Sequence, residues 1–299
     1  MWPRRQRCIC CRRGVRGKAL SHEALIAKET RLTRRFSALR KSNRGGLIVF
    51  TTAGDPDPAT SATILRALPS AGADIIEVGM PFSDPMADGP AIQSASQRAL
   101  SAGMTLPKTL SMVETFRKSD KDTPVILMGY FNPIYQYGIE MFVQDAVAAG
   151  VDGLIIVDLP PEEDDELCHP ALTAGLHWIR LITPTTDDLR MKTVLQNTSG
   201  FVYYVSITGI TGTRSASADV MRPALQRLRK HTRLPIAVGF GIQTPQQIRE
   251  IITDSDAVVV GSALVREIER NISKHGISTN DLVNKVTERI RELATALKD

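Results

Sequence analysis

The sequence contains no apolar run approaching the roughly 20 residues that a membrane-spanning helix needs. Cysteine is also scarce, with four residues in 299, and Cys8, Cys10 and Cys11 are crowded together without a second cluster. That spacing predicts neither a disulfide framework nor a zinc site. A chain of this length buries about three quarters of its unfolded surface, so it folds without such cross-links. We therefore expect an ordinary globular protein that holds no metal.

Acidic side chains are absent before Glu23. Residues 1–45 hold 14 Lys and Arg and two acids, a net charge of +12, whereas the remainder holds 23 bases and 30 acids, a net charge of −7. The basic character thus belongs to an N-terminal arm, residues 1–20, which we expect to be disordered. A nucleic-acid-binding protein would carry this charge on its folded face, so neither nucleic acid nor a membrane is expected as a partner.

The arm has two interpretations. It is Arg-rich and acid-poor like a transit peptide, but only Ser21 supplies serine nearby, and it lacks a secretory apolar core. An upstream, non-functional start accounts for it equally well. The expected location is the cytoplasm, or a plastid if the arm is part of a transit peptide.

After the arm, apolar runs alternate with amphipathic stretches, and no linker interrupts residues 21–299. Strands are predicted at 47–52, 73–79, 124–130, 153–158, 178–182, 201–206, 235–239 and 257–261. Helices are predicted at 23–40, 59–71, 91–102, 106–119, 139–149, 162–174, 187–197, 217–229, 245–252, 263–272 and 280–297. This α/β alternation predicts one (β/α)8 TIM barrel with an extra N-terminal helix and further additional helices.

Two carboxylates in and after the second predicted strand are candidates for acid and base catalysis. Glu77 lies inside the apolar run Ala73–Gly79, where an ionised carboxylate is costly without a partner. Asp88 follows eleven residues later in a loop rich in Gly and Pro. Carboxyl groups in such different surroundings can have different pKa values, as acid and base catalysis requires. The structural alternatives are a buried ion pair for Glu77 and a helix N-cap for Asp88.

In such a barrel the C-terminal strand ends and the loops after them form the site. These places hold Phe50, Glu77, Asp88, Tyr130, Asp158 and Tyr203. Glycine-rich turns, Val238–Ile242 and Val260–Ala263, follow the seventh and eighth strands. Free N–H groups at such turns bind anions, and phosphate sites recur there in barrel enzymes. Gly212, after the sixth strand, could add a donor, and Ser262 could instead be an N-cap. Cys168, beside His169, is interpreted as a helix-face thiol rather than a nucleophile.

Five motifs resemble those of one family, the tryptophan synthase α subunit. They are TTAGDP from Thr51, EVGMPFSDPMADGPAIQ from Glu77, TGITG from Thr208, GFGI from Gly239 and GSA from Gly261. The second is highly specific, and the resemblance runs from about Leu25 to the C-terminus. It implies a lyase of tryptophan biosynthesis that cleaves indole-3-glycerol phosphate by a retro-aldol reaction. The products are indole and glyceraldehyde 3-phosphate, and no cofactor takes part.

The resemblance also implies roles for individual residues. Glu77 would act as acid and then base, and Asp88 would accept the indole N–H. The phosphate would be held by Gly212, Gly241, Gly261 and Ser262. The indole pocket would be lined by Phe50, Met128 and Tyr203, which could equally be ordinary barrel core. Thr211, on a lid loop from Ile207 to Ser215, would hydrogen-bond Asp88 on closing.

The implied partner is a tryptophan synthase β subunit, in an α2β2 heterotetramer, contacted through the loop around Asp84 and Pro85. Apolar Met80, Phe82 and Met86 are expected to be solvent-exposed there, or else to cap the barrel. Two alternatives remain. One is a stand-alone lyase that releases free indole; the other is a catalytically silent phosphate-binding protein or a nucleic-acid binder that uses the arm.

Overall fold

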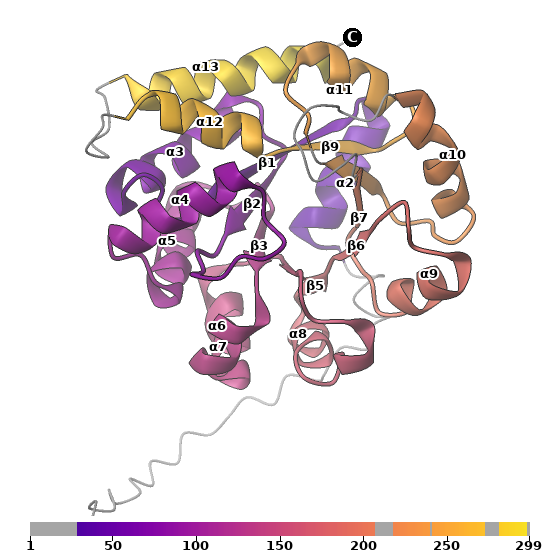
Figure 1. The fold of residues 1–299 in the computed structure, drawn as a ribbon, viewed down its shortest axis with the longest axis horizontal. Coiled ribbons are helices and arrows are strands. Elements are labelled where there is room, and N and C mark those ends of the chain that lie inside the picture. The colour runs from indigo at the N-terminus through magenta and orange to yellow at the C-terminus, as the bar shows by residue number, and fades with distance from the viewer. Residues whose placement is uncertain (1–28, 207–217, 240, 273–280, 298–299) are drawn as a thin grey trace, which may run out of the picture.

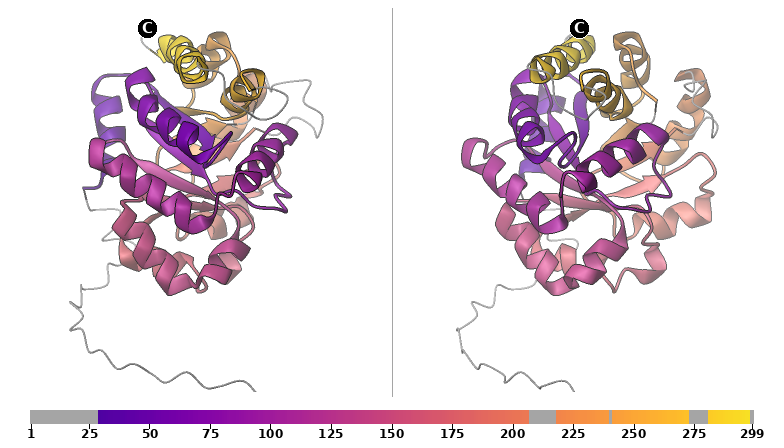
Figure 2. Two further views of the ribbon diagram at one scale, coloured as in Figure 1. Left: turned by 90° about the vertical axis from the view of Figure 1, so that its left-hand side faces the viewer. Right: turned by 60° about the vertical axis from the view of Figure 1, so that its left-hand side comes forward.

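Nine parallel strands form one sheet in the computed structural model, which describes residues 29–206, 218–239, 241–272 and 281–297. The sheet runs in the order β5-β4-β3-β2-β1-β9-β8-β7-β6 and curls into a nearly closed barrel inside a ring of helices (Figure 1, Figure 2). This confirms the predicted (β/α)8 architecture. The strands are β1 Gly46–Thr52, β2 Ile75–Gly79, β3 Val125–Gly129, β4 Gly153–Ile156, β5 His177–Trp178, β6 Arg180–Ile182, β7 Val202–Val205, β8 Ile236–Gly239 and β9 Ala257–Val260.

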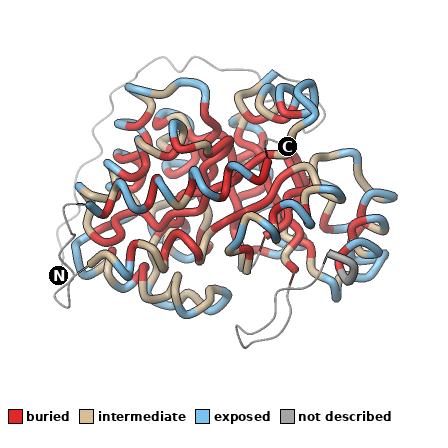
Figure 3. Tube along the Cα trace, turned by 90° about the horizontal axis from the view of Figure 1, so that it is seen from above, coloured by how far each residue is buried: buried red, intermediate tan, exposed pale blue. Residues whose placement is uncertain are grey.

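Helices follow the strands and cover the outer face of the sheet, with their own outer surfaces exposed (Figure 3). Each helix in the described ranges is too short or too polar to traverse a bilayer. The helices are α2 Arg31–Lys41, α3 Pro58–Ala71, α4 Pro90–Ser101, α5 Leu106–Ser119, α6 Phe131–Tyr137, α7 Ile139–Ala149, α8 Cys168–Ala174, α9 Asp188–Leu195, α10 Ala218–Arg229, α11 Pro245–Ile252, α12 Ser262–Arg270 and α13 Leu282–Ala294, with 3-10 turns η1 Pro161–Glu163 and η2 Thr295–Leu297.

The strands bury both faces because successive side chains point to opposite sides of a sheet. On β2, Ile76 and Val78 pack in the large core between sheet and helices, whereas Ile75 belongs to a second core inside the barrel. Glu77 lies two residues beyond Ile75, so it shares the inward face. The strand pattern therefore places Glu77 inside the barrel, toward the end at which β2 finishes.

Helix α2 closes the opposite end of the barrel. Its buried face, Leu32, Phe36 and Leu39, joins the interior core, and the rings of Phe36 and Phe201 lie 5.8 Å apart. The predicted start of this helix was wrong within the described residues: it begins at Arg31, because Thr30 is the N-cap and accepts a hydrogen bond from the Thr33 N–H. Residues 1–28, including the arm, lie outside the described residues.

Three other predictions needed correction. The fifth predicted strand is split into β5 and β6 around Ile179, because β5 pairs with β4 while β6 pairs with β7. The predicted helix 162–174 is reduced to η1 and α8. Pro170 lacks an N–H and lies in the first turn of α8, which begins at Cys168; a proline at that place interrupts no intrahelical hydrogen bond. Helix α6, directly after β3, was not predicted.

Candidate active site

A cavity of about 120 Å³ lies at the C-terminal ends of the strands, at the end of the barrel opposite α2. Its wall continues the period-two pattern of the barrel interior: on five strands, a residue two positions beyond an interior side chain faces the cavity. These pairs are Ile48 and Phe50, Ile75 and Glu77, Ile126 and Met128, Ile155 and Val157, and Phe201 and Tyr203. The same alternation thus fills the barrel below and shapes the site above.

Glu77 is fully buried in this wall, with Phe50 on β1 and Ile126 on β3 as its neighbours in register. Neither carboxyl oxygen has a hydrogen-bond partner among the residues described. The structural alternative, a buried ion pair, is therefore wrong. Burial without a partner disfavours the charged form and raises the pKa of Glu77 to about 8. At neutral pH its carboxyl group carries a proton.

Asp88 lines the same cavity from the end of the loop that joins β2 to α4. It is not the N-cap of α4: Gly89 holds that position, and no side chain caps the helix. Gln93 fixes the Asp88 backbone by donating from its side-chain amide to the Asp88 carbonyl, at 2.8 Å. Desolvation raises the pKa of Asp88 to about 6, and hydrogen bonding from Tyr130 opposes this rise. Between about pH 6 and 8 Asp88 is therefore ionised while Glu77 is protonated.

Another part of the cavity wall is suited to an anion. Gly241 has a φ of +83°, a conformation that favours glycine, and no atom lies within 4 Å of where a Cβ would stand. Gly261 and Ser262 lie where α12 begins. Gly261 is the N-cap and Ser262 the first helical residue, so the N-cap alternative for Ser262 is wrong. The first N–H groups of a helix lack intrahelical partners and sit at its positive end, which makes this wall a ready anion site.

The cavity therefore combines a buried acid, an ionised carboxylate and an anion site in one barrel. The sequence model of one family, described as the tryptophan synthase alpha chain, matches residues 36–297. This chain belongs to the tryptophan synthase alpha chain family. Membership implies a lyase that performs the retro-aldol step on indole-3-glycerol phosphate in tryptophan biosynthesis.

Solved structures of the tryptophan synthase family agree. The alpha subunit from Legionella pneumophila str. Paris is 38% identical, with a TM-score of 0.83 over 90% of this chain and 99% of that one. The tryptophan synthase from M. tuberculosis, in its aminoacrylate-bound form, is 31% identical, with a TM-score of 0.79 over 90% of this chain and 100% of that one. The likeness thus covers the whole barrel.

The structure brings together most of the side chains for which the family resemblance implied a role. Those lining the cavity are Phe50, Glu77, Asp88, Met128, Tyr203, Gly241, Gly261 and Ser262. Thr211, Gly212 and the rest of the expected lid, Ile207–Ser215, lie outside the described residues. Sequence reasoning missed part of the apolar wall, Ile92, Val157, Leu181, Val205 and Val259. Following the period-two pattern along each predicted strand to its C-terminal end would have found all of these except Ile92, which lies on α4.

The loop after β2 differs from its expected exposure at one residue. Met86 is 83% exposed and Phe82 is half-buried, but Met80 is buried, so its predicted exposure was wrong. Met80 packs against Gly129, where an added Cβ would lie 2.7 Å from the Met80 methyl carbon. It also anchors the loop, since its N–H donates to the Met128 carbonyl at 2.8 Å.

Cys168 is buried rather than on an exposed helix face. Desolvation raises the pKa of its thiol, and Asp164 and Arg180 are its charged neighbours. The ring of His169 is turned away to Asp165, with its Nδ1 at 2.7 Å from the Asp165 Oδ1. The two residues therefore form no nucleophile pair.

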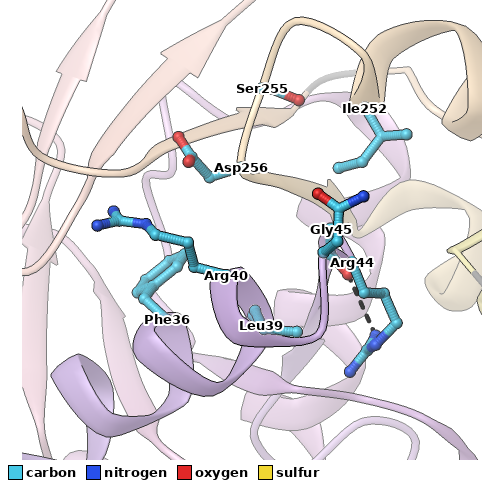
Figure 4. A pocket seen from close by; sticks show the side chains of 9 residues that line it. Phe36, Leu39, Arg40, Arg44, Gly45, Ile252, Ser255 and Asp256 are labelled. Atoms are coloured by element: carbon cyan, nitrogen blue, oxygen red, sulfur yellow. Dashed lines mark hydrogen bonds between the residues drawn. The ribbon is translucent and has the colours of Figure 1, made fainter.

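A second pocket, of about 210 Å³, lies at the far end of the barrel between α2 and the turn before β9 (Figure 4). Two of its charged groups, Arg44 and Asp256, hold neighbouring segments of the chain together. Arg44 makes two hydrogen bonds to the carboxylate of Asp74, at 2.9 and 2.7 Å, and Asp256 accepts the Ile236 N–H at 2.8 Å. The cavity that holds Glu77 and Asp88 is thus the candidate active site.

Proposed function

We propose that Glu77 and Asp88 catalyse the retro-aldol cleavage of indole-3-glycerol phosphate in this chain. The observation that carries the proposal is a fully buried carboxyl group, without a hydrogen-bond partner in the described part of the chain, that shares one cavity with an ionised carboxylate. Groups whose surroundings separate their pKa values in this way are suited to acid and base roles. Family membership implies the retro-aldol reaction, and the carboxyl groups of Glu77 and Asp88 are suited to its acid and base steps.

The reaction breaks the bond between indole C3 and the neighbouring hydroxyl-bearing carbon. Glu77 starts protonated and gives its proton to C3, which places positive charge on the ring. Asp88 accepts the indole N–H and stabilises that charge. As the bond breaks, its electron pair returns to the ring, and the ionised Glu77 removes the hydroxyl proton to form the aldehyde. Glu77 ends protonated, as it began, and no external acid or base is consumed.

The rest of the cavity orients the substrate. We propose that the N–H groups at Gly241, Gly261 and Ser262 hold the phosphate, with Gly212 as a further donor. Phe50, Met128 and Tyr203 would then enclose the indole ring, and Thr211 would hydrogen-bond Asp88 from the lid. Such a clamp fixes C3 beside Glu77, and holding reacting atoms in place lowers the barrier substantially.

The direct test is turnover of indole-3-glycerol phosphate by Glu77→Gln, which keeps the side-chain shape but cannot donate or accept the proton. We expect a loss of at least about 10²–10⁴-fold in kcat, because one residue serves two proton transfers. Circular dichroism should show an unchanged fold. Near-normal turnover by this variant would overturn the assignment of Glu77.

We also propose a tryptophan synthase β subunit as the partner, in an α2β2 assembly, docked at the loop around Asp84 and Pro85. The exposed side chain of Met86 in this loop supports an interface. Titrating the purified chain with β subunit while following cleavage tests this. A rise in kcat that saturates is expected. No response would favour the stand-alone lyase that releases free indole.

A further inference from the structure

Tyr130 contacts the β2–α4 loop, which carries Asp88, but has no role in the reaction described above. It follows β3 as the N-cap of α6, and it is almost completely buried, at 3% exposure. Its hydroxyl accepts a hydrogen bond from the Ala87 N–H, at 3.0 Å. The same hydroxyl has one hydrogen left to donate, and the carboxylate of Asp88, the next residue in the loop, lies near enough for this hydroxyl to lower its pKa.

The surroundings of Tyr130 keep this hydroxyl in place. Its ring lies against Phe82, with centroids 5.4 Å apart, so the two ends of the loop pack around it. The residue that follows is fixed as well, because the Phe131 N–H donates to the Asp158 carboxylate at 2.8 Å. With Met80 bonded to β3 at the start of the loop, Tyr130 provides the matching attachment at its end.

We propose that Tyr130 is a positioning residue for the lyase reaction, whose hydroxyl holds the end of the β2–α4 loop and aims the Asp88 carboxylate into the cavity. This rests on the role proposed for Asp88. The Asp88 backbone is fixed by Gln93, and within the described residues Tyr130 is the side chain whose hydroxyl acts on the Asp88 carboxylate. Without that hydroxyl the carboxylate could rotate away from the indole N–H.

The hydroxyl also affects the charge of Asp88. Desolvation raises the pKa of Asp88, and the hydrogen bond from Tyr130 lowers it. The other titratable groups in the described cavity wall are Glu77 on β2, which is protonated when Asp88 ionises, and Tyr203 on β7, whose pKa burial raises well above its ordinary value. Desolvation raises the pKa of the Tyr130 hydroxyl most, and the charges of Asp88 and then of Asp158 raise it further. Removing the hydroxyl should therefore raise the pKa of Asp88.

Tyr130→Phe removes one oxygen atom and keeps the ring and its contact with Phe82. We expect kcat for indole-3-glycerol phosphate to fall about ten- to a hundredfold, as for loss of a hydrogen bond to a charged group, while KM changes less. The acid limb of kcat/KM should move to higher pH. The phosphate of the substrate titrates equally with both proteins, so the difference between them reports the enzyme.

Tyr137→Phe is a matched control. It also removes a tyrosine hydroxyl bonded to a carboxylate, that of Asp145 at 2.5 Å, and it lies on the same helix. A merely structural role predicts similar effects for the two variants, whereas positioning predicts that only Tyr130→Phe lowers kcat and moves the acid limb. Unchanged kcat and acid limb in Tyr130→Phe would overturn the proposal.

Two further measurements separate this proposal from the proposed function. In an Asp88→Asn background, Tyr130→Phe should cause no additional loss of kcat, and an additive loss would refute action through Asp88. ¹³C NMR titration of aspartate-labelled protein follows the Asp88 carboxyl without turnover, and its pKa should rise in Tyr130→Phe. If Asp88→Asn retained full activity, the role of Asp88 would fail, yet the titration would still show whether Tyr130 acts on its carboxyl.

Discussion

The buried carboxyl group of Glu77 should make the folded protein less stable as pH rises. Burial raises its pKa from an ordinary 4.5 to about 8, so the folded state keeps a proton that the unfolded chain has released. For a group whose pKa is raised on folding, the stability is fully present below the unfolded value and is lost as pH rises toward the folded value. Above about pH 8 both states are ionised and the loss stops.

Each pH unit between those two values costs the folded wild-type protein about 1.4 kcal/mol. By pH 7 the loss reaches about 3 kcal/mol, which is a large share of the 5–15 kcal/mol that typically holds a domain folded. Glu77→Gln is neutral at every pH and avoids this loss. Its buried amide adds an unpaired polar group, but that cost does not change with pH. The same substitution that we expect to abolish catalysis should therefore stabilise the chain relative to wild type increasingly as pH rises.

The assay is urea unfolding of the wild-type chain and Glu77→Gln at several pH values from about 5 to about 8. The quantity of interest is the difference in unfolding free energy between them, because all other titrating groups are common to both and cancel. We expect that difference to grow by about 1.4 kcal/mol per pH unit in favour of the variant. A difference that does not depend on pH would mean that Glu77 is ionised in the folded protein, and the reasoning about its proton would be refuted.

Three other outcomes follow from the same structure. The pH profile of kcat/KM should be bell-shaped. Its acid limb, near pH 6, reports the ionisation of Asp88, and its basic limb, near pH 8, reports the loss of the Glu77 proton. A profile that is flat between about pH 5 and 9 would contradict both assignments. Burial lowers the pKa of His177 from 6.5 to about 4, so its contribution to the free energy of unfolding is fully present above pH 6.5 and is lost as pH falls toward 4. In urea unfolding over that interval, the free energy of unfolding of His177→Gln should fall by about 3 kcal/mol less than that of wild type. Arg98→Met removes the two hydrogen bonds, at 2.7 and 3.0 Å, that pair Arg98 with the fully buried Asp55. It should lower the free energy of unfolding by about 3–5 kcal/mol, and adding Asp55→Asn should restore part of that loss. A urea unfolding midpoint equal to that of wild type would show that the pair is dispensable.

The sequence predicted the order and most bounds of the elements, because helix and strand periodicity is a local property of the chain. Helices α5 and α11 have the predicted ends, and each has an N-cap threonine, Thr105 and Thr244. Predictions failed where a distant partner decided the outcome. The break at Ile179 reflects a change of partner strand, and the burial of Met80 reflects its packing against Gly129.

For the site, the sequence by itself singled out the residues to which we assign the chemistry: an acid inside an apolar strand, a second in a Gly- and Pro-rich loop, and glycines after two strands. It left open whether Glu77 was paired and whether Asp88 and Ser262 capped helices. Only the nearly closed barrel decided these points among the described residues, because partners and solvent access depend on segments far apart in the chain. The contact between Ala87 and Tyr130 spans 43 residues, and no local pattern specifies it. Because the sheet curls, the C-terminal ends of its strands surround one cavity. Burial in the wall of that cavity gives two chemically similar carboxyl groups, Glu77 and Asp88, different pKa values.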